Sequence, residues 1–61
     1  MPLIDVRLYQ DRLDERTRAE LIGRLTDAAA AVLGDEVREH TWVVLTGVPR
    51  QSWGIAGEPG A

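Results

Sequence analysis

The order of three segments most strongly limits the fold of this chain. Ile4, Val6 and Leu8 alternate with polar residues and Tyr9 through residues 3–9, which predicts a half-buried β-strand. Residues 41–46 are β-branched, aromatic or leucine, and predict a second strand that is buried on both faces. With a helix between them, the two strands form a β-α-β unit, in which they run parallel and the crossover is right-handed.

The segment between the strands predicts one long helix over residues 14–33. Asp14 is the expected N-cap, because its carboxylate can accept a hydrogen bond from a free backbone N–H of the first turn. Gly34 fits the position just past the last turn. Residues 10–13 and 34–39 are predicted to be polar connections. The apolar residues recur at steps of three and four and predict a single packed face, made of Leu21, Ile22, Leu25, Ala28, Ala29, Val32 and Leu33.

The last third of the chain is rich in residues that favour turns. Residues 47–51 contain a Val-Pro pair and predict a turn. Residues 52–57 predict a short strand or one arm of a hairpin, and residues 58–61 are expected to fray. Residues 1–61 are therefore predicted to form one α/β domain.

Such a unit cannot cover its own apolar surface. A two-stranded sheet with one helix leaves two open edges and one uncovered face. The chain has no cysteine and one histidine, so neither a disulfide nor a structural zinc ion is expected to stabilise it. Burial of Trp42, Val44, Trp53 and Ile55 is therefore assigned to other chains. Homo-oligomerisation is predicted to complete the fold.

Charge and hydropathy argue against several classes of function. Seven basic residues against ten acidic ones give a net charge of −3 and a pI near 4.9. A nucleic-acid or membrane-surface protein, including a ribbon-helix-helix regulator, is not expected, because phosphate recognition needs a basic surface. The longest apolar run, residues 28–33, is too short to span a bilayer, and no signal peptide is recognised at the N-terminus. We therefore expect a cytoplasmic protein.

Pro2 is the residue whose position suggests chemistry. Removal of an initiator methionine before proline exposes a secondary amine at the start of the first strand. Burial or nearby cations lower the pKa of such an amine, which can then act as a base near neutral pH. If Met1 is retained, Pro2 is an amide and has no basic nitrogen. The chain has no cysteine nucleophile, nucleophile elbow or glycine-rich phosphate loop.

Several segments together carry a family resemblance. They are the Met-Pro start, Arg12 after the first strand, and Val-Pro-Arg-Gln-Ser-Trp-Gly-Ile-Ala-Gly at residues 48–57. Over essentially its full length the chain resembles the 4-oxalocrotonate tautomerase family, although Ala56 stands where that family commonly has glycine. The resemblance implies that two β-α-β subunits pair into a four-stranded sheet backed by helices. It also implies a homo-oligomer built from dimers, commonly a hexamer of three.

The resemblance further implies a tautomerase that uses no cofactor and no metal. Pro2 would be the general base in the enol–keto or double-bond isomerisation of a small 2-oxo acid or dienol. Arg12 falls where the family has an arginine that binds the substrate carboxylate, a role suited to its bidentate fork. Trp53 falls where an aromatic residue walls the pocket, and Tyr9 where another residue lines it.

Two departures from the family pattern leave alternatives open. The family's second arginine, supplied by a neighbouring subunit, aligns with Thr41; Arg38 and His40 lie nearby, and the three are candidates for its role. Asp11 replaces a usual glycine and puts a negative charge beside Arg12. The alternatives are a hydratase- or dehalogenase-like relative, and a non-catalytic scaffold or inactive partner subunit.

Overall fold

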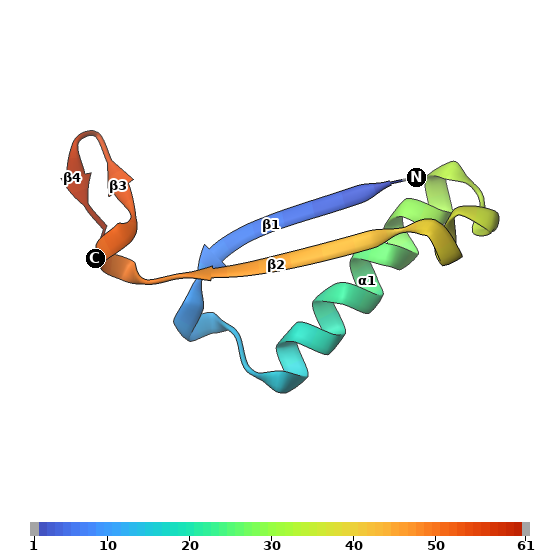
Figure 1. The fold of residues 1–61 in the computed structure, drawn as a ribbon, viewed down its shortest axis with the longest axis horizontal. Coiled ribbons are helices and arrows are strands. Elements are labelled where there is room, and N and C mark those ends of the chain that lie inside the picture. The colour runs from blue at the N-terminus through green and yellow to red at the C-terminus, as the bar shows by residue number, and fades with distance from the viewer. Residues whose placement is uncertain (1, 61) are drawn as a thin grey trace.

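Two parallel strands and one long helix form the body of the molecule (Figure 1). The computed structural model describes residues 2–60. β1 (Leu3–Tyr9) pairs along its whole length with β2 (Trp42–Val48), and α1 (Glu15–Leu33) connects them on one side of the sheet. The predicted β-α-β unit with parallel strands is confirmed. The first strand also has the predicted bounds.

The two ends of α1 lie where the capping residues predict. The Asp14 carboxylate accepts a hydrogen bond from the Thr17 N–H at 2.8 Å, and the Thr17 hydroxyl accepts one from the Asp14 N–H at 2.9 Å. Together these two bonds close a capping box, in which each residue satisfies a backbone donor of the other. Gly34 has φ 105° and donates its N–H to the carbonyl of Ala30 at 2.9 Å, which ends the helix.

The packed face of α1 is narrower than the apolar spacing predicts. The apolar residues on its covered side are Leu21, Leu25, Ala29 and Ala30. Among residues 2–60 only Ala30 counts as buried, with 6 % of its surface exposed. The remaining apolar residues of the predicted face are exposed in a single chain: Ile22, Ala28, Val32 and Leu33. Two strands about 4.8 Å apart are too narrow to cover the full apolar side of a helix about 10 Å across.

The sheet face opposite α1 is uncovered within one chain. Leu3 and Trp42, which are paired in register, are 62 % and 60 % exposed, and Val44 is 44 % exposed. Within one chain the second strand is thus covered on one face only, in agreement with the assignment of Trp42 and Val44 to contacts with other chains. Its coverage by other chains stays a prediction.

β2 begins one residue later and ends two residues later than the predicted strand over 41–46. The extension reaches Gly47 and Val48, which still pair with β1. A Cβ atom on Gly47 would lie 2.8 Å from Cβ of Gln10 and 3.3 Å from Cδ1 of Leu13. Glycine at this position therefore lets the turn after β1 pack against the end of β2.

The connections are short 3-10 helices instead of irregular loops. η1 (Gln10–Arg12) follows β1, η2 (Asp35–His40) follows α1, and η3 (Arg50–Ser52) follows β2. In each one, the N–H of the residue that follows the turn donates a hydrogen bond to a backbone carbonyl within the turn. These turns place polar side chains at fixed orientations beside both ends of the sheet.

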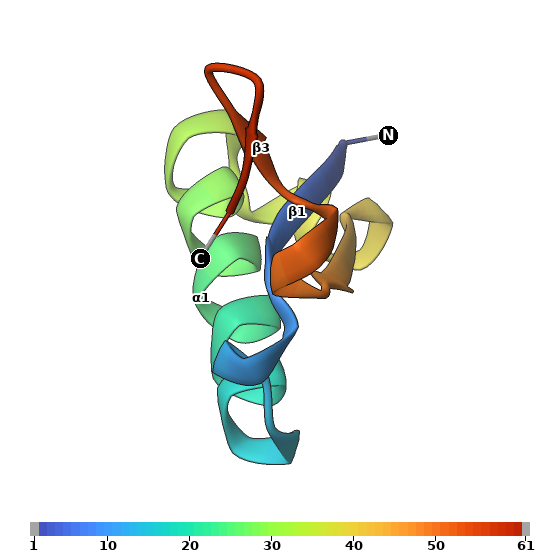
Figure 2. The ribbon, with the colours of Figure 1, turned by 90° about the vertical axis from the view of Figure 1, so that its left-hand side faces the viewer.

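The C-terminal segment forms a small hairpin beyond the end of the sheet (Figures 1 and 2). β3 (Gly54–Ile55) pairs antiparallel with β4 (Glu58–Pro59). The two residues between them, Ala56 and Gly57, have φ 54° and 83°, as a tight hairpin turn requires. The predicted hairpin arm is confirmed. The expected fraying is wrong for residues 58–59, because this turn brings them back onto β3.

The chain is extended for its size. Its radius of gyration is 14.1 Å, whereas a compact domain of this length would have roughly 10–11 Å. Its principal extents are 42 × 25 × 14 Å. No helix in the described part of the chain is long and apolar enough to cross a membrane.

Candidate functional site

A hollow of about 420 Å³ opens at the C-terminal end of β1, the end that faces the viewer in Figure 2. It combines apolar and aromatic walls with two arginines. Three of the predicted site residues, Tyr9, Arg12 and Trp53, meet there although Trp53 is distant from the others in sequence. We call this site the aromatic hollow; its lining residues are Arg7, Leu8, Tyr9, Arg12, Trp53 and Ile55.

One wall of the aromatic hollow is a pair of tilted rings. The centroids of Tyr9 and Trp53 lie 5.1 Å apart with an angle of 56° between the ring planes. This is a favourable arrangement for aromatic quadrupoles. The Gly60 N–H donates to the Trp53 carbonyl, and a Cβ on Gly60 would lie 2.8 Å from Cβ of Trp53. The chain after the hairpin therefore packs tightly behind this wall.

Arg50 also contacts the Tyr9 ring. Its guanidinium carbon lies 4.3 Å from the ring centroid, within cation–π range. Its Nε donates to the Asp11 carboxylate at 2.9 Å. Asp11 therefore has a cation partner on η3, although the sequence sets it beside Arg12.

Arg12 has a different environment from Arg50. It lines the aromatic hollow and also a neighbouring depression, which it shares with Leu8, Thr17, Glu20 and Leu21. Within residues 2–60, no carboxylate lies close enough to Arg12 to form an ion pair. Its guanidinium is thus an available site for a carboxylate ligand beside an apolar wall.

Pro2 lies at the opposite end of β1. It is half-buried, and its carbonyl accepts a hydrogen bond from the Trp42 N–H at 2.9 Å. Seven residue steps of about 3.3 Å separate it from Tyr9, a distance of about 23 Å. One chain therefore does not bring Pro2 to its own aromatic hollow. Met1, whose removal decides whether Pro2 has an amine, lies outside the described residues.

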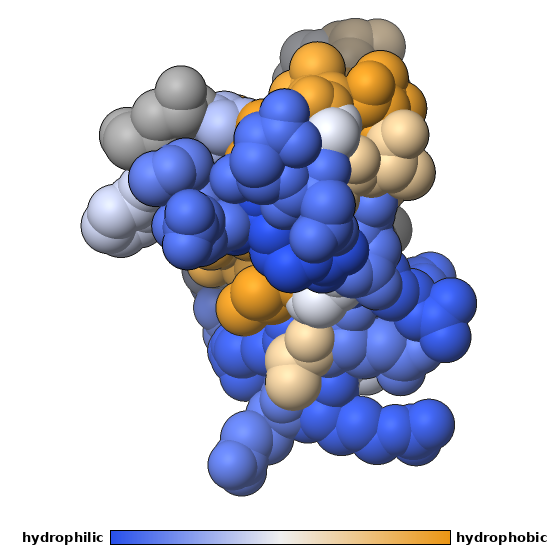
Figure 3. All heavy atoms as spheres, turned by 90° about the vertical axis from the view of Figure 1, so that its right-hand side faces the viewer, coloured by the Kyte–Doolittle hydropathy of each residue, from blue (hydrophilic) through white to orange (hydrophobic). Residues whose placement is uncertain are grey.

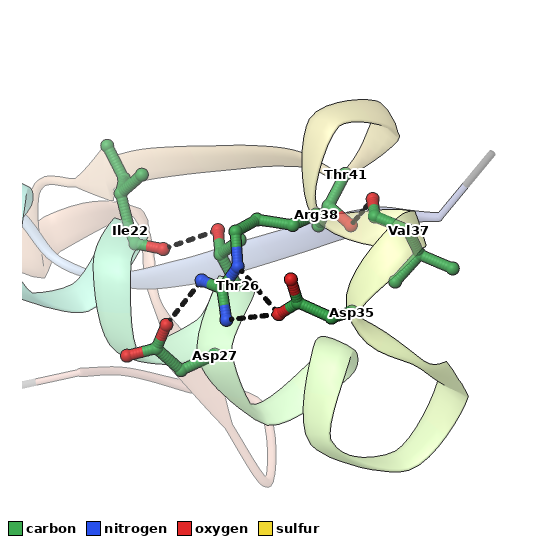
Figure 4. A network of polar contacts seen from close by, with 7 residues as sticks. All are labelled: Ile22, Thr26, Asp27, Asp35, Val37, Arg38 and Thr41. Carbon is green, nitrogen blue, oxygen red and sulfur yellow. Dashed lines mark hydrogen bonds and ion pairs between the residues drawn. The ribbon is translucent and has the colours of Figure 1, made fainter.

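Arg38 is tied to two carboxylates near the Pro2 end of the sheet (Figure 4). Its Nη1 lies 2.6 Å from Oδ1 of Asp27, and its Nε donates to Oδ1 of Asp35 at 3.1 Å. These side-chain hydrogen bonds, first to Asp27 and then to Asp35, raise the pKa of Arg38. The guanidinium thus fastens η2 to α1.

The two other candidates for the family's second arginine lie near Arg38. His40 is exposed at the end of η2, with Nε2 3.8 Å from a Glu39 carboxylate oxygen. The half-buried Thr41 donates its hydroxyl proton to the Val37 carbonyl at 2.8 Å. Figure 3 faces this end of the molecule and shows mostly hydrophilic side chains. Neither residue lines the aromatic hollow, and which of the three candidates binds substrate stays a prediction.

Sequence reasoning missed several residues around the aromatic hollow. Arg7 shares strand parity with Tyr9, so the alternation of β1 contains a signal for it. No local pattern links Arg50 to Asp11, because 39 positions separate them. Among the described residues, no group of three or more histidine or acidic side chains is arranged to hold a metal ion.

Comparison with known proteins gives two similarities over nearly the whole chain. A family model described as "Tautomerase enzyme" matches residues 2–61. A protein from Ralstonia nicotianae, named a probable tautomerase, is 49 % identical over 59 residues, which cover 97 % of this chain and 81 % of that protein. Both matched spans extend across the sheet and the aromatic hollow.

Proposed function

Because the chain belongs to the tautomerase family, we propose that it is a cofactor-free tautomerase with the amine of Pro2 as its general base. Its substrate class is a small 2-oxo acid or the corresponding dienol. The Pro2 nitrogen takes the proton from the 2-hydroxyl of the dienol, and the electron pair of that O–H bond forms the 2-oxo group. The double bonds shift, and a proton from Pro2 adds to the distant carbon. The atoms of substrate and product are the same.

The observation that carries this proposal is the chemistry of the aromatic hollow. Arg12 offers a cation that no described carboxylate neutralises, and it can bind a substrate carboxylate through two parallel hydrogen bonds. Tyr9 and Trp53 supply an apolar wall, and exclusion of water strengthens electrostatic interactions near the reacting atoms. Apolar surroundings also favour the neutral, basic form of a nearby amine.

The distance between Pro2 and the aromatic hollow supports a site shared between copies of the chain. The two lie about 23 Å apart on one chain, at the two ends of a single strand. A second copy that runs antiparallel to the first brings its Pro2 toward the hollow of its partner. The uncovered sheet face and the extended shape favour assembly as well. We propose a homo-oligomer built from dimers, and a hexamer as its final form.

The experiment follows the ultraviolet absorbance of phenylenolpyruvate or 2-hydroxymuconate as the enol is consumed. Protein whose mass shows loss of Met1 is compared with Pro2→Ala. We expect clear acceleration by the processed protein and a large loss in the variant. The matched control is the same chain with Met1 retained, which keeps every side chain but converts the Pro2 amine to an amide. It should be as inactive as Pro2→Ala.

The opposite results separate the competing functions. No acceleration by protein with a free Pro2 amine would exclude an enol tautomerase and leave the hydratase-like relative or the scaffold. Equal activity with and without Met1 would exclude Pro2 as the base.

A further inference from the structure

We propose that Arg50 is a positioning residue, which neutralises Asp11 and holds Tyr9 so that Arg12 stays available to the substrate carboxylate. This inference rests on the proposed function, since it concerns how the same site binds its substrate. It names a role for a residue that is not expected to touch the substrate.

The two charged side chains of η1 point in different directions. Asp11 and Arg12 are consecutive residues of a 3-10 turn, so their side chains leave the axis about 120° apart. Arg12 lines the aromatic hollow, whereas Asp11 lines a separate surface depression together with Pro49 and Arg50. The bond of 2.9 Å from Arg50 Nε to Asp11 ties the carboxylate to that second surface.

Arg50 also contacts the aromatic wall of the hollow. The guanidinium of Arg50 lies 4.3 Å from the centroid of Tyr9, and Tyr9 packs at 5.1 Å against Trp53. A planar guanidinium can stack on a ring and bond a carboxylate at the same time, which a lysine ammonium does less well. One side chain therefore determines both where the Asp11 charge points and where the Tyr9 ring lies.

The ion pair between Arg50 and Asp11 contributes little to the stability of the fold. The side chains of Arg50 and Asp11 are 48 % and 55 % exposed, and ion pairs this exposed contribute little to folding. The larger effect falls on Arg12. Loss of Arg50 would release the Asp11 carboxylate, which could then rotate toward the adjacent Arg12. A carboxylate that pairs with Arg12 competes directly with the carboxylate of a ligand.

The experiment measures binding of cis,cis-muconate, a dicarboxylate without the 2-hydroxyl group, by calorimetry in a Pro2→Ala background. Turnover is thereby removed from the readout. We expect Arg50→Met, which keeps a long apolar stem without the charge, to raise the Kd about tenfold. The matched control is Arg16→Met, which removes the same charge from an exposed residue of α1 that lines neither the aromatic hollow nor the neighbouring depression. It should change the Kd less than about twofold.

The decisive variant is Asp11→Asn combined with Arg50→Met, which has the same net charge as the parent. The Kd is expected to return to within about twofold of the value for the parent, which is the Pro2→Ala protein without further changes. The reason is that the Asp11 carboxylate no longer competes for Arg12. A purely structural role of Arg50 predicts no such rescue. A double variant that binds as weakly as Arg50→Met would overturn the proposal. An Arg50→Met variant that binds as tightly as the Arg16→Met control would overturn it as well.

A further variant guards against misfolding of Arg50→Met. Asp11→Asn alone keeps Arg50 and is expected to bind muconate at least as tightly as the parent; weaker binding would contradict the inference. The result is separable from the proposed function. The processed protein could fail to accelerate enol decay while the variants still bind muconate with the expected rescue. That result would support the positioning role of Arg50 and refute the proposed tautomerase activity. No muconate binding by the parent would refute the inference about Arg50.

Discussion

Nη1 of Arg38 lies 2.6 Å from Oδ1 of Asp27, so a residue of η2 is fastened to the middle of α1 (Figure 4). Asp35 contacts the same guanidinium from the first turn of η2 at 3.1 Å. A guanidinium held by two carboxylates of its own chain has little free capacity for a third carboxylate from a substrate. Arg38 therefore connects the crossover helix to the segment that leads into β2.

We expect Arg38→Met to lower the Tm only slightly, because both of its ion pairs are exposed and only their combination into a network adds stability. KM for 2-hydroxymuconate should stay within about twofold of wild type. The reason is that the substitution frees Asp27 and Asp35 without removing a group that the substrate needs. Thermal unfolding followed by circular dichroism and steady-state kinetics on one preparation provide the measurement. A large increase in KM at unchanged Tm would instead identify Arg38 as the residue that replaces the family's second arginine.

Arg12→Gln tests the carboxylate site directly. Loss of a charged, bidentate donor should raise KM or lower kcat/KM by about 10- to 100-fold, because a charge-assisted hydrogen bond is worth about 1.5–3 kcal/mol. Arg16→Gln removes the same charge from an exposed residue in the first turn of α1 and serves as the control. If both variants lose activity equally, general electrostatic attraction explains the effect, and Arg12 has no specific role.

The cap of α1 makes part of the stability depend on pH. The backbone hydrogen bond from Thr17 is the main cause that lowers the pKa of Asp14, with burial opposing it. A carboxyl group with a lowered pKa in the folded state contributes stability above its unfolded pKa, near 3.9, and loses it as the pH falls through the folded value. The Tm advantage of wild type over Asp14→Asn should therefore be present at pH 6 and disappear toward pH 2. An advantage that is constant from pH 6 to pH 2 would contradict this prediction.

Substitution by alanine should change the free energy of unfolding in opposite directions at Gly47 of β2 and Gly23 of α1. Gly47→Ala is expected to destabilise the fold by about 1–3 kcal/mol, because the new Cβ would lie 2.8 Å from Cβ of Gln10. Gly23→Ala is expected to stabilise it by about 1 kcal/mol, since Gly23 lies inside α1 with open space around it. Urea unfolding of both variants measures the difference. A Gly47→Ala variant at least as stable as wild type would refute the packing assigned to Gly47, and a destabilised Gly23→Ala variant would refute the open space assigned to Gly23.

The hairpin turn contains one strained residue. Ala56 has φ 54°, a left-handed conformation that costs an L-residue with a Cβ about 1–2 kcal/mol. Ala56→Gly should therefore slow amide exchange in β3 and β4, whereas Gly57→Ala, at φ 83°, should speed it. Faster exchange in Ala56→Gly would show that backbone strain at this position is negligible.

The elements of the fold could be predicted because local rules define them. Alternation along residues 3–9 reproduces β1, and Asp14 and Gly34 mark the two ends of α1 through hydrogen bonds to nearby backbone groups. That Tyr9, Arg12 and Trp53 line one hollow was expected from the family resemblance alone. The roles of Pro2, His40 and Thr41 in substrate binding or catalysis stay predictions.

The amino-acid sequence by itself determined the order and type of the two long strands and the helix, together with the caps of that helix, since each depends on residues within a few positions of one another. Only the tertiary structure decided that Asp11 pairs with Arg50, that Arg38 pairs with Asp27, and that half of the apolar face of α1 stays exposed. These outcomes depend on contacts between elements distant in sequence and on the width of a two-stranded sheet. Neither leaves a periodic signal in the chain.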